Sequence, residues 1–201
     1  MNESAPQSLP AAIPRGILAE SAERPLAAFH FCNVRPGAAV LGQMLEPVVR
    51  SGRRALVLTR TAARAALLSR GLWCYRRTAF LPHGTDGEKA ALQPVLLTAT
   101  PVNVNGADVL VLPDGEPIGD IELRVAAAPE FLRGFALVVT LLDATDPDAV
   151  RSAGRSWAAA RDLGFETVAF EREAPAAARR GGPAASSDLE SPVPLRWHRI
   201  S

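Results

Sequence analysis

Short runs of almost uninterrupted apolar residues alternate along this chain with segments whose apolar side chains recur at helical spacing. The apolar runs lie at 26–33, 54–59, 94–99, 107–113, 135–143 and 165–171. The helical patterns lie at 37–52, 61–70 and 146–164. Strands without polar alternation are typical of a parallel sheet that is buried on both faces. The pattern therefore predicts an α/β fold with a mostly parallel sheet and helices on both faces.

Turn and cap residues mark the ends of the expected helices. Gly52 and Gly71 follow the first two helical patterns, as glycine often does after a last helical turn. Asp146 stands where an N-cap side chain accepts a backbone hydrogen bond, and Pro147 occupies the first turn after it. Gly164 ends the same helix. Each helix thus has its own start or stop signal.

The apolar patterning is confined to the middle of the 201 residues. Residues 1–25 carry four prolines and few bulky apolar groups, which predicts a flexible N-terminal extension. Residues 173–201 mix Pro, Gly, Ala and Ser, which predicts a disordered C-terminal tail. We therefore expect a single domain over 26–172 with flexible termini.

Charge and composition restrict the classes of partner. Lys and Arg number 22 against 21 Asp and Glu, so no net positive field favours direct binding of nucleic acid. No run approaches 18 apolar residues, and the N-terminus has no apolar signal-peptide core. Cys32 and Cys74 are the only cysteines and form no C-x-x-C pair. These features predict a cytoplasmic protein that does not use a membrane.

Sheets of this kind often bind nucleotides, but the sequence lacks the expected phosphate-binding loops. After the first strand the chain reads NVRPGAAVLG, which is neither G-x-G-x-x-G nor a P-loop. The segment HGTDGEKAA at 83–91 has part of a P-loop composition, but its spacing is wrong. Turns and helix ends explain these glycines better, so we expect no cofactor.

The main alternative is a small α/β enzyme that depends on a metal ion or a nucleotide and uses the loop with His83, Asp86 and Glu88. Side chains of these types can bind a metal ion. However, no second cluster completes a metal site, and no Ser/His/Asp or Cys/His set stands out in the sequence. Solvated loop residues, with a structural histidine, are the simpler interpretation.

The helix expected at 146–164 carries a band of arginines. At about 100° per residue, Arg151 and Arg155 lie roughly 40° apart, and Arg161 lies about 80° to the other side of Arg151. Apolar side chains, among them Trp157, occupy the opposite half. The band is either an ordinary solvated face or a site for an anionic partner.

A second candidate site lies at 71–84, where the sequence reads GLWCYRRTAFLPHG. Trp and Phe flanked by Arg are typical of the centre of a protein interface. Trp73 packs either in the core or in such an interface, and Phe80 either closes the sheet edge or contacts a partner. Direct binding of single-stranded DNA through Trp73, Tyr75 and the arginines is a further option, which the near-neutral charge disfavours.

Four segments together resemble one protein family. They read LWCYRRTAFLPHG, QPVLLTATPVNVNGADVLVLPDG, FLRGFALVVTLLD and DPDAVRSAGRSWAAARDLGFE. In this order and spacing the chain resembles the chi subunit of bacterial DNA polymerase III holoenzyme, from about Phe29 to Phe170. The resemblance implies a Rossmann-like sheet without a nucleotide site. It also implies a non-catalytic adaptor of the clamp-loader complex.

The resemblance implies a protein partner on the clamp-loader side. Family members bind the small psi subunit, and the segment that contributes to that contact maps onto Trp73, Phe80, Leu81 and Pro82. The sequence leaves open whether a psi subunit or another clamp-loader subunit binds there.

The second implied partner is the acidic, Phe-terminated tail of the single-stranded-DNA-binding protein, through which contact with nucleic acid is indirect. Guanidinium groups suit its carboxylates, and a recess at the Gly-Phe turn would hold its terminal ring. Family members commonly carry an aromatic residue where this chain has Ala160, which changes the expected recess. The residues that match this site are Arg151, Arg155, Trp157, Arg161, Gly164 and Phe165.

Overall fold

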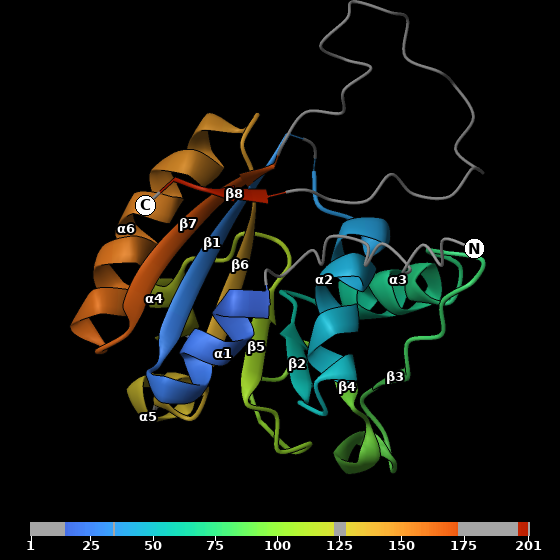
Figure 1. Cartoon of the computed structure of the whole chain (residues 1–201). Coiled ribbons are helices and arrows are strands. Elements are labelled where there is room, and N and C mark those ends of the chain that lie inside the picture. Colours follow the sequence, from blue (N-terminus) through green and yellow to red (C-terminus); the bar gives the residue numbers. More distant parts are fainter. Residues whose placement is uncertain (1–14, 34, 123–127, 173–196, 201) are drawn as a thin grey trace, which may run out of the picture.

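The structure, a computed structural model, describes residues 15–33, 35–122, 128–172 and 197–200. The strands are β1 (Leu26–Cys32), β2 (Ala55–Leu58), β3 (His83–Thr85), β4 (Val95–Thr98), β5 (Val109–Leu112), β6 (Leu137–Asp143), β7 (Glu166–Arg172) and β8 (Trp197–Arg199). They form one sheet in the order β3-β4-β2-β5-β6-β1-β7-β8 (Figure 1). All neighbours from β3 to β7 are parallel, and β8 pairs antiparallel with β7. The predicted mostly parallel α/β fold is confirmed.

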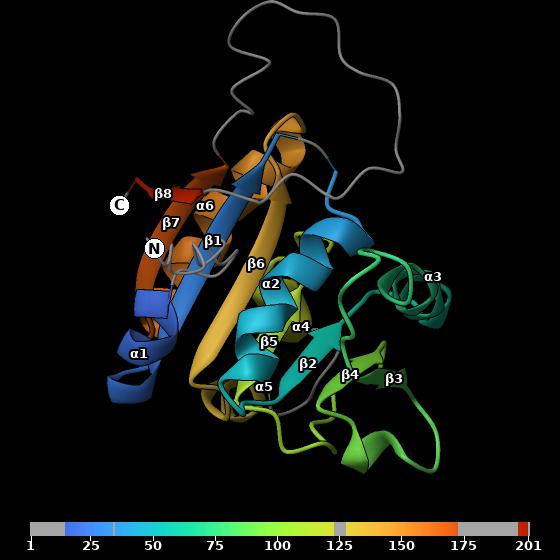
Figure 2. The ribbon, with the colours of Figure 1, turned by 45° about the vertical axis from the view of Figure 1, so that its right-hand side comes forward.

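Helices lie on both faces of this sheet (Figures 1 and 2). They are α1 (Arg15–Glu23), α2 (Ala38–Arg50), α3 (Ala62–Leu72), α4 (Ile118–Glu122), α5 (Ala128–Arg133) and α6 (Pro147–Asp162), with a 3-10 turn, η1, at Ala90–Leu92. The first three pack on one face, and α4, α5 and α6 pack on the other. Along β1, Leu26 and Ala28 face the first group, whereas Ala27 and Phe29 face the second. Successive side chains of a strand point to opposite faces, and helices cover both faces here. The strands are therefore apolar on both sides.

The cap signals in the sequence act as expected, except that Gly71 lies inside α3, which continues to Leu72. The Asp146 side chain accepts a hydrogen bond from the Asp148 backbone N–H at the start of α6, and Pro147 stands in the first turn. Thr61 caps α3 by accepting from the Arg64 N–H. Gly164 has φ 91° just beyond α6, a conformation that favours glycine. Asp146 and Gly164 thus mark the two ends of α6, the helix that carries the arginines.

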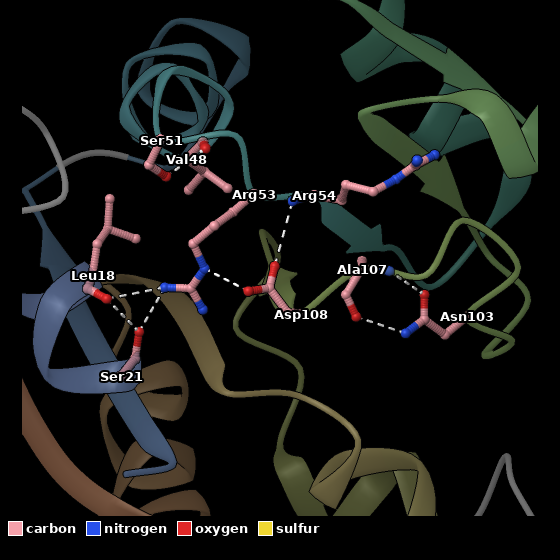
Figure 3. Close-up of polar contacts among 9 residues, drawn as sticks. All are labelled: Leu18, Ser21, Val48, Ser51, Arg53, Arg54, Asn103, Ala107 and Asp108. Carbon is pink, nitrogen blue, oxygen red and sulfur yellow. Dashed lines mark hydrogen bonds and ion pairs between the residues drawn. The ribbon is translucent and has the colours of Figure 1, made fainter. Parts of the chain in front are cut away.

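The prediction of a flexible extension over 1–25 is wrong for residues 15–23, which form α1. Ile17 is buried against the sheet, and Arg53 donates hydrogen bonds to the Leu18 carbonyl (3.2 Å) and the Ser21 hydroxyl (2.7 Å) (Figure 3). Arg53 is in turn paired with Asp108 at 2.6 Å, so α1 is tied to the amino ends of β2 and β5. The sequence of a short, weakly patterned segment does not reveal tertiary contacts of this kind. Residues 1–14 lie outside the described residues.

The prediction of a disordered tail over 173–201 is likewise wrong for its end. Strand β8 pairs with the last residues of β7, in the register Phe170 with Arg199 and Arg172 with Trp197. The Ile200 N–H also donates to the Ala169 carbonyl at 2.9 Å. Residues 173–196 and 201 lie outside the described residues.

No helix in the described part of the chain is long and apolar enough to span a membrane.

Candidate protein-docking surfaces

Two exposed aromatic residues follow α3 and form what we call the aromatic surface, Trp73 and Phe80. Their side chains are 59% and 76% exposed, so neither ring packs in the core. The ring centroids are 6.2 Å apart in a tilted arrangement. Adjacent exposed aromatic rings are uncommon on a surface that contacts only water. Their exposure favours the interface interpretation of both residues.

The other two residues predicted for this site lie deeper. Leu81 is buried in the core cluster beneath α2 and α3, and Pro82 is half-buried. Leu81 therefore anchors the segment from below and offers no side-chain surface to a partner. The accessible part of the predicted site consists of Trp73 and Phe80, with Pro82 at its border.

His83 supports the aromatic surface from behind. Its ring is buried, with Nδ1 2.8 Å from the Leu81 carbonyl oxygen and Nε2 3.1 Å from the Ser69 carbonyl oxygen. The Trp73 ring packs on it at 4.6 Å between centroids. His83 thus joins the end of α3 to the start of β3, which is the structural role expected from the sequence.

The same geometry weakens the metal alternative. Both nitrogens of His83 face carbonyl oxygens, and Asp86 accepts a hydrogen bond from the Thr98 hydroxyl at 2.9 Å. Glu88 is exposed. Among the residues that the structure describes, no three His, Cys, Asp or Glu side chains converge as metal ligands. The loop is held by these contacts as a structural element.

A buried carboxylate lies between α2 and the residues that follow α3, and the sequence interpretation missed it. Glu46 accepts from the Tyr75 hydroxyl at 2.5 Å and is paired with Arg76 at 2.6 Å and Arg50 at 3.0 Å. Burial, followed by the hydrogen bond to Glu46, raises the pKa of Tyr75 above its usual value. The helical pattern gave no signal, because Glu46 falls on the side of that pattern opposite Val40, Met44 and Val48, and its burial depends on the packing of Tyr75 against α2.

The arginine band on α6 is exposed as predicted. Arg151, Arg155 and Arg161 all reach solvent, and we call them the arginine face. Arg151 is paired with Asp148 one turn earlier on the same helix. Both partners of that pair are largely exposed, so the pair contributes little to stability and can exchange for another carboxylate.

The apolar members of the same predicted site lie mainly inside. Trp157 is half-buried on Phe29, with ring centroids 5.3 Å apart. Ala160 and Phe165 are buried in the core cluster on this side of the sheet. Gly164 remains exposed. A ligand at this end of α6 would therefore meet Arg161, the Gly164 backbone and the outer edge of Trp157, and would not meet the Phe165 ring.

The two surfaces lie far apart on the fold. The aromatic surface borders β3 at one edge of the sheet, on the face covered by α1, α2 and α3 (Figures 1 and 2). The arginine face belongs to α6, which packs on the opposite face over β6, β1 and β7. One is apolar and the other is cationic, so they suit different ligands.

Comparison with known proteins agrees with the family resemblance seen in the sequence. The family model of the DNA polymerase III chi subunit, HolC, matches residues 25–168. A curated protein of Rickettsia prowazekii (strain Madrid E), named "Probable DNA polymerase III subunit chi", is 26% identical over 102 residues. That similarity covers 50% of this chain and 59% of the relative, which is less than two thirds of its length. Helix α1 and strand β8 lie outside the matched residues.

Proposed function

Since the chain belongs to the family of DNA polymerase III chi subunits, we propose that it serves the polymerase as a non-catalytic adaptor. In this role it tethers the clamp loader to single-stranded-DNA-binding protein. The observation that carries the proposal is the presence of two exposed surfaces of different chemistry at separated positions on one sheet. An adaptor needs two such sites that can be occupied together.

The arginine face is the proposed site for the acidic tail of the single-stranded-DNA-binding protein. Arg151 and Arg155 are one helical turn apart and exposed, which suits a short peptide with several carboxylates. Guanidinium groups form forked hydrogen bonds with carboxylates, including a terminal one. The terminal phenyl ring of the tail would lie against Gly164 and the edge of Trp157, since Phe165 and Ala160 are buried.

The aromatic surface is the proposed site for the clamp loader, through a psi subunit or another of its subunits. Trp and Phe side chains that are already exposed supply apolar area at a small cost in side-chain entropy, because each has only two rotatable side-chain bonds. No cofactor or direct contact with DNA is part of this role. The adaptor would act in the cytoplasm, where the replication machinery works.

The arginine face is tested by binding of a fluorescently labelled acidic tail peptide, measured by fluorescence anisotropy. A hydrogen bond to a charged group contributes about 1.5–3 kcal/mol, so Arg151→Ala/Arg155→Ala should weaken binding at least roughly tenfold. Wild-type affinity should also fall as the salt concentration rises. Deleting the terminal Phe of the peptide should weaken binding by a similar factor.

A matched control removes two exposed arginines from the other face of the sheet. Arg60→Ala/Arg70→Ala makes the same change in net charge near α3, and it should alter peptide affinity less than about twofold. Equal losses in both double variants would show a general effect of charge without a site on α6. Absence of peptide binding by the wild-type protein would refute the proposed link to single-stranded-DNA-binding protein.

A further inference from the structure

The aromatic surface is carried by a segment that has no regular secondary structure of its own. Helix α3 ends at Leu72 and β3 begins at His83, and residues 73–82 between them form turns and irregular chain. A segment of this kind would normally sample several conformations, and each side chain fixed on binding would lower the affinity. The packing beneath residues 73–82 therefore matters for any ligand of Trp73 and Phe80.

Glu46 makes two polar contacts with this segment and a third with Arg50 on its own helix. Its Oε1 atom accepts from the Tyr75 hydroxyl at 2.5 Å and lies 2.6 Å from the Arg76 guanidinium, while Oε2 pairs with Arg50 at 3.0 Å. The Glu46 side chain is only 10% exposed. A buried carboxylate with one hydrogen bond and two ion pairs has one favourable position, and this restrains the groups that contact it.

Helix α2 is shaped to receive Tyr75. Gly42 lies one turn before Glu46, and a Cβ atom at position 42 would come within 2.5 Å of the Tyr75 ring. One further turn back, the Cβ of Ala38 lies 2.5 Å from where a Cβ on Gly71 would be. Positions 38, 42 and 46 share one face of α2. The small residues bring α3 and Tyr75 close, and the carboxylate then binds the hydroxyl.

The contacts of Glu46 reach both rings of the aromatic surface through the backbone. Tyr75 is two residues after Trp73, at the end of the turn closed by the hydrogen bond from the Cys74 N–H to the Gly71 carbonyl. Arg76 begins the next turn, in which the Ala79 N–H donates to the Arg76 carbonyl at 3.3 Å. Phe80 follows Ala79 directly. Glu46 thus holds the middle of the segment whose two ends carry the rings.

We infer that Glu46 is a positioning residue, which acts through Tyr75 and Arg76 to hold Trp73 and Phe80 in the arrangement that a clamp-loader subunit binds. This inference rests on the proposed function of the aromatic surface. Glu46 itself does not touch the partner, because it is buried under the segment. Its contribution is the preorganisation of an irregular segment, which lowers the entropy cost of binding.

The test measures binding of the purified clamp-loader complex of the same organism to the immobilised full-length protein. Tyr75→Phe removes only the hydroxyl and keeps the ring over Gly42, and Glu46→Gln removes the charge with little change in shape. We expect affinity losses of at least about threefold for Tyr75→Phe and about fivefold for Glu46→Gln. Arg50→Ala is the matched control, because Arg50 is 72% exposed and contacts Glu46 from the solvent side. It should change affinity less than about twofold.

A second readout separates positioning from plain stability. In a background with Trp157→Phe and Trp197→Phe, Trp73 is the only tryptophan, and its fluorescence anisotropy decay reports the motion of that ring. Tyr75→Phe and Glu46→Gln should each add a fast component to the decay under conditions where urea titration shows the protein fully folded. Loss of stability alone would leave the ring equally immobile in the folded protein.

The outcomes distinguish this inference from the proposed function. If the wild-type protein does not bind the clamp loader, or if Phe80→Ala binds as well as wild type, the proposed function of the aromatic surface fails and this inference fails with it. If Phe80→Ala loses binding while folded Tyr75→Phe and Glu46→Gln retain full affinity and an immobile Trp73, only the positioning role of Glu46 is overturned. If Glu46→Gln does not fold, Tyr75→Phe alone decides the matter.

Discussion

Individual side chains in the interior of this protein are held in one protonation state by their surroundings. Complete burial lowers the pKa of His30 to about 3, so that the ring is neutral where it stacks on Phe170. Burial raises the pKa of the Cys32 thiol to about 12, which keeps that cysteine unreactive. Glu46 is held in place by a hydrogen bond from Tyr75 and by ion pairs with Arg76 and Arg50. A group that stays neutral in the fold but takes up a proton in the unfolded chain makes the free energy of unfolding depend on pH.

His30 should therefore make the fold less stable in mild acid. In the unfolded chain its pKa is near 6.5, whereas in the fold it is about 3, so the unfolded state binds the proton first as the pH falls. The full contribution of neutral His30 to the free energy of unfolding is present above pH 6.5, and it declines as the pH falls toward 3. Between pH 7 and pH 5 the free energy of unfolding should fall by about 2 kcal/mol from this group. Urea unfolding at both pH values measures the change.

The control for this prediction is His30→Asn, which keeps a polar side chain without a titrating group. The variant should be less stable at pH 7 but should lose about 2 kcal/mol less than wild type on going to pH 5. The same pH dependence in both proteins would assign the effect to other residues.

Phe80→Ala should separate binding from stability. Because the ring is 76% exposed, its removal should change the free energy of unfolding by less than about 1 kcal/mol, against about 3–5 kcal/mol for a buried phenylalanine. Clamp-loader affinity should fall at least roughly tenfold, as expected for an aromatic residue at the centre of an interface. Leu92→Ala is the control, since Leu92 is similarly exposed at 73% but lies outside the aromatic surface. A loss of 3 kcal/mol or more in Phe80→Ala would contradict the surface position.

Helices and strands with clear periodicity could be predicted from the sequence, and the others could not. Every apolar run became a strand, and α2, α3 and α6 begin and end within a few residues of the patterns that predicted them. Strands β3 and β8 have three residues each, and α4 and α5 have five and six, which is too short for a period to be visible. Their positions depend on contacts between residues distant in the sequence.

Some features of the candidate sites could likewise be predicted from the sequence, and others could not. The exposure of the arginine face followed from helix geometry, because one helix fixes the relative directions of Arg151 and Arg155. The exposure of Trp73 did not follow, because it depends on how residues 73–82 pack on His83 and α2. The role of Glu46 depends on a contact across 29 positions, from Glu46 to Tyr75, which no local pattern reveals.

Strand β8 gives a prediction about the edge of the sheet. Deleting residues 197–201 leaves the outer edge of β7 without the backbone partner that it has in this structure. Amide hydrogen exchange should become faster in β7 near Phe170 to Arg172, and the uncovered edge should raise the tendency to self-associate at high concentration. Removing Ser201 alone is the control and should change neither property. Unchanged exchange in β7 after the larger deletion would show that β8 does not cover this edge in solution.

As one body, the described part of the protein is a mostly parallel sheet with a different exposed surface toward each edge. The arginine face and the aromatic surface are separated by the buried strands of the sheet, so a ligand on one has no direct contact with the other. Substitutions at the two surfaces should therefore have independent effects, since distant sites without shared partners are usually additive. In the proposed function, this separation would let one small subunit hold two large partners together.

The most direct test is a bridging measurement. Single-stranded DNA coated with its binding protein is immobilised, and the clamp-loader complex is passed over it with and without this protein. The wild-type protein should retain the clamp loader on the DNA. Arg151→Ala/Arg155→Ala and Phe80→Ala should each abolish most of that retention, while Arg60→Ala/Arg70→Ala should preserve it. Absence of retention with the wild-type protein, or full retention with both the arginine-face and the Phe80 variants, would contradict an adaptor with these two surfaces.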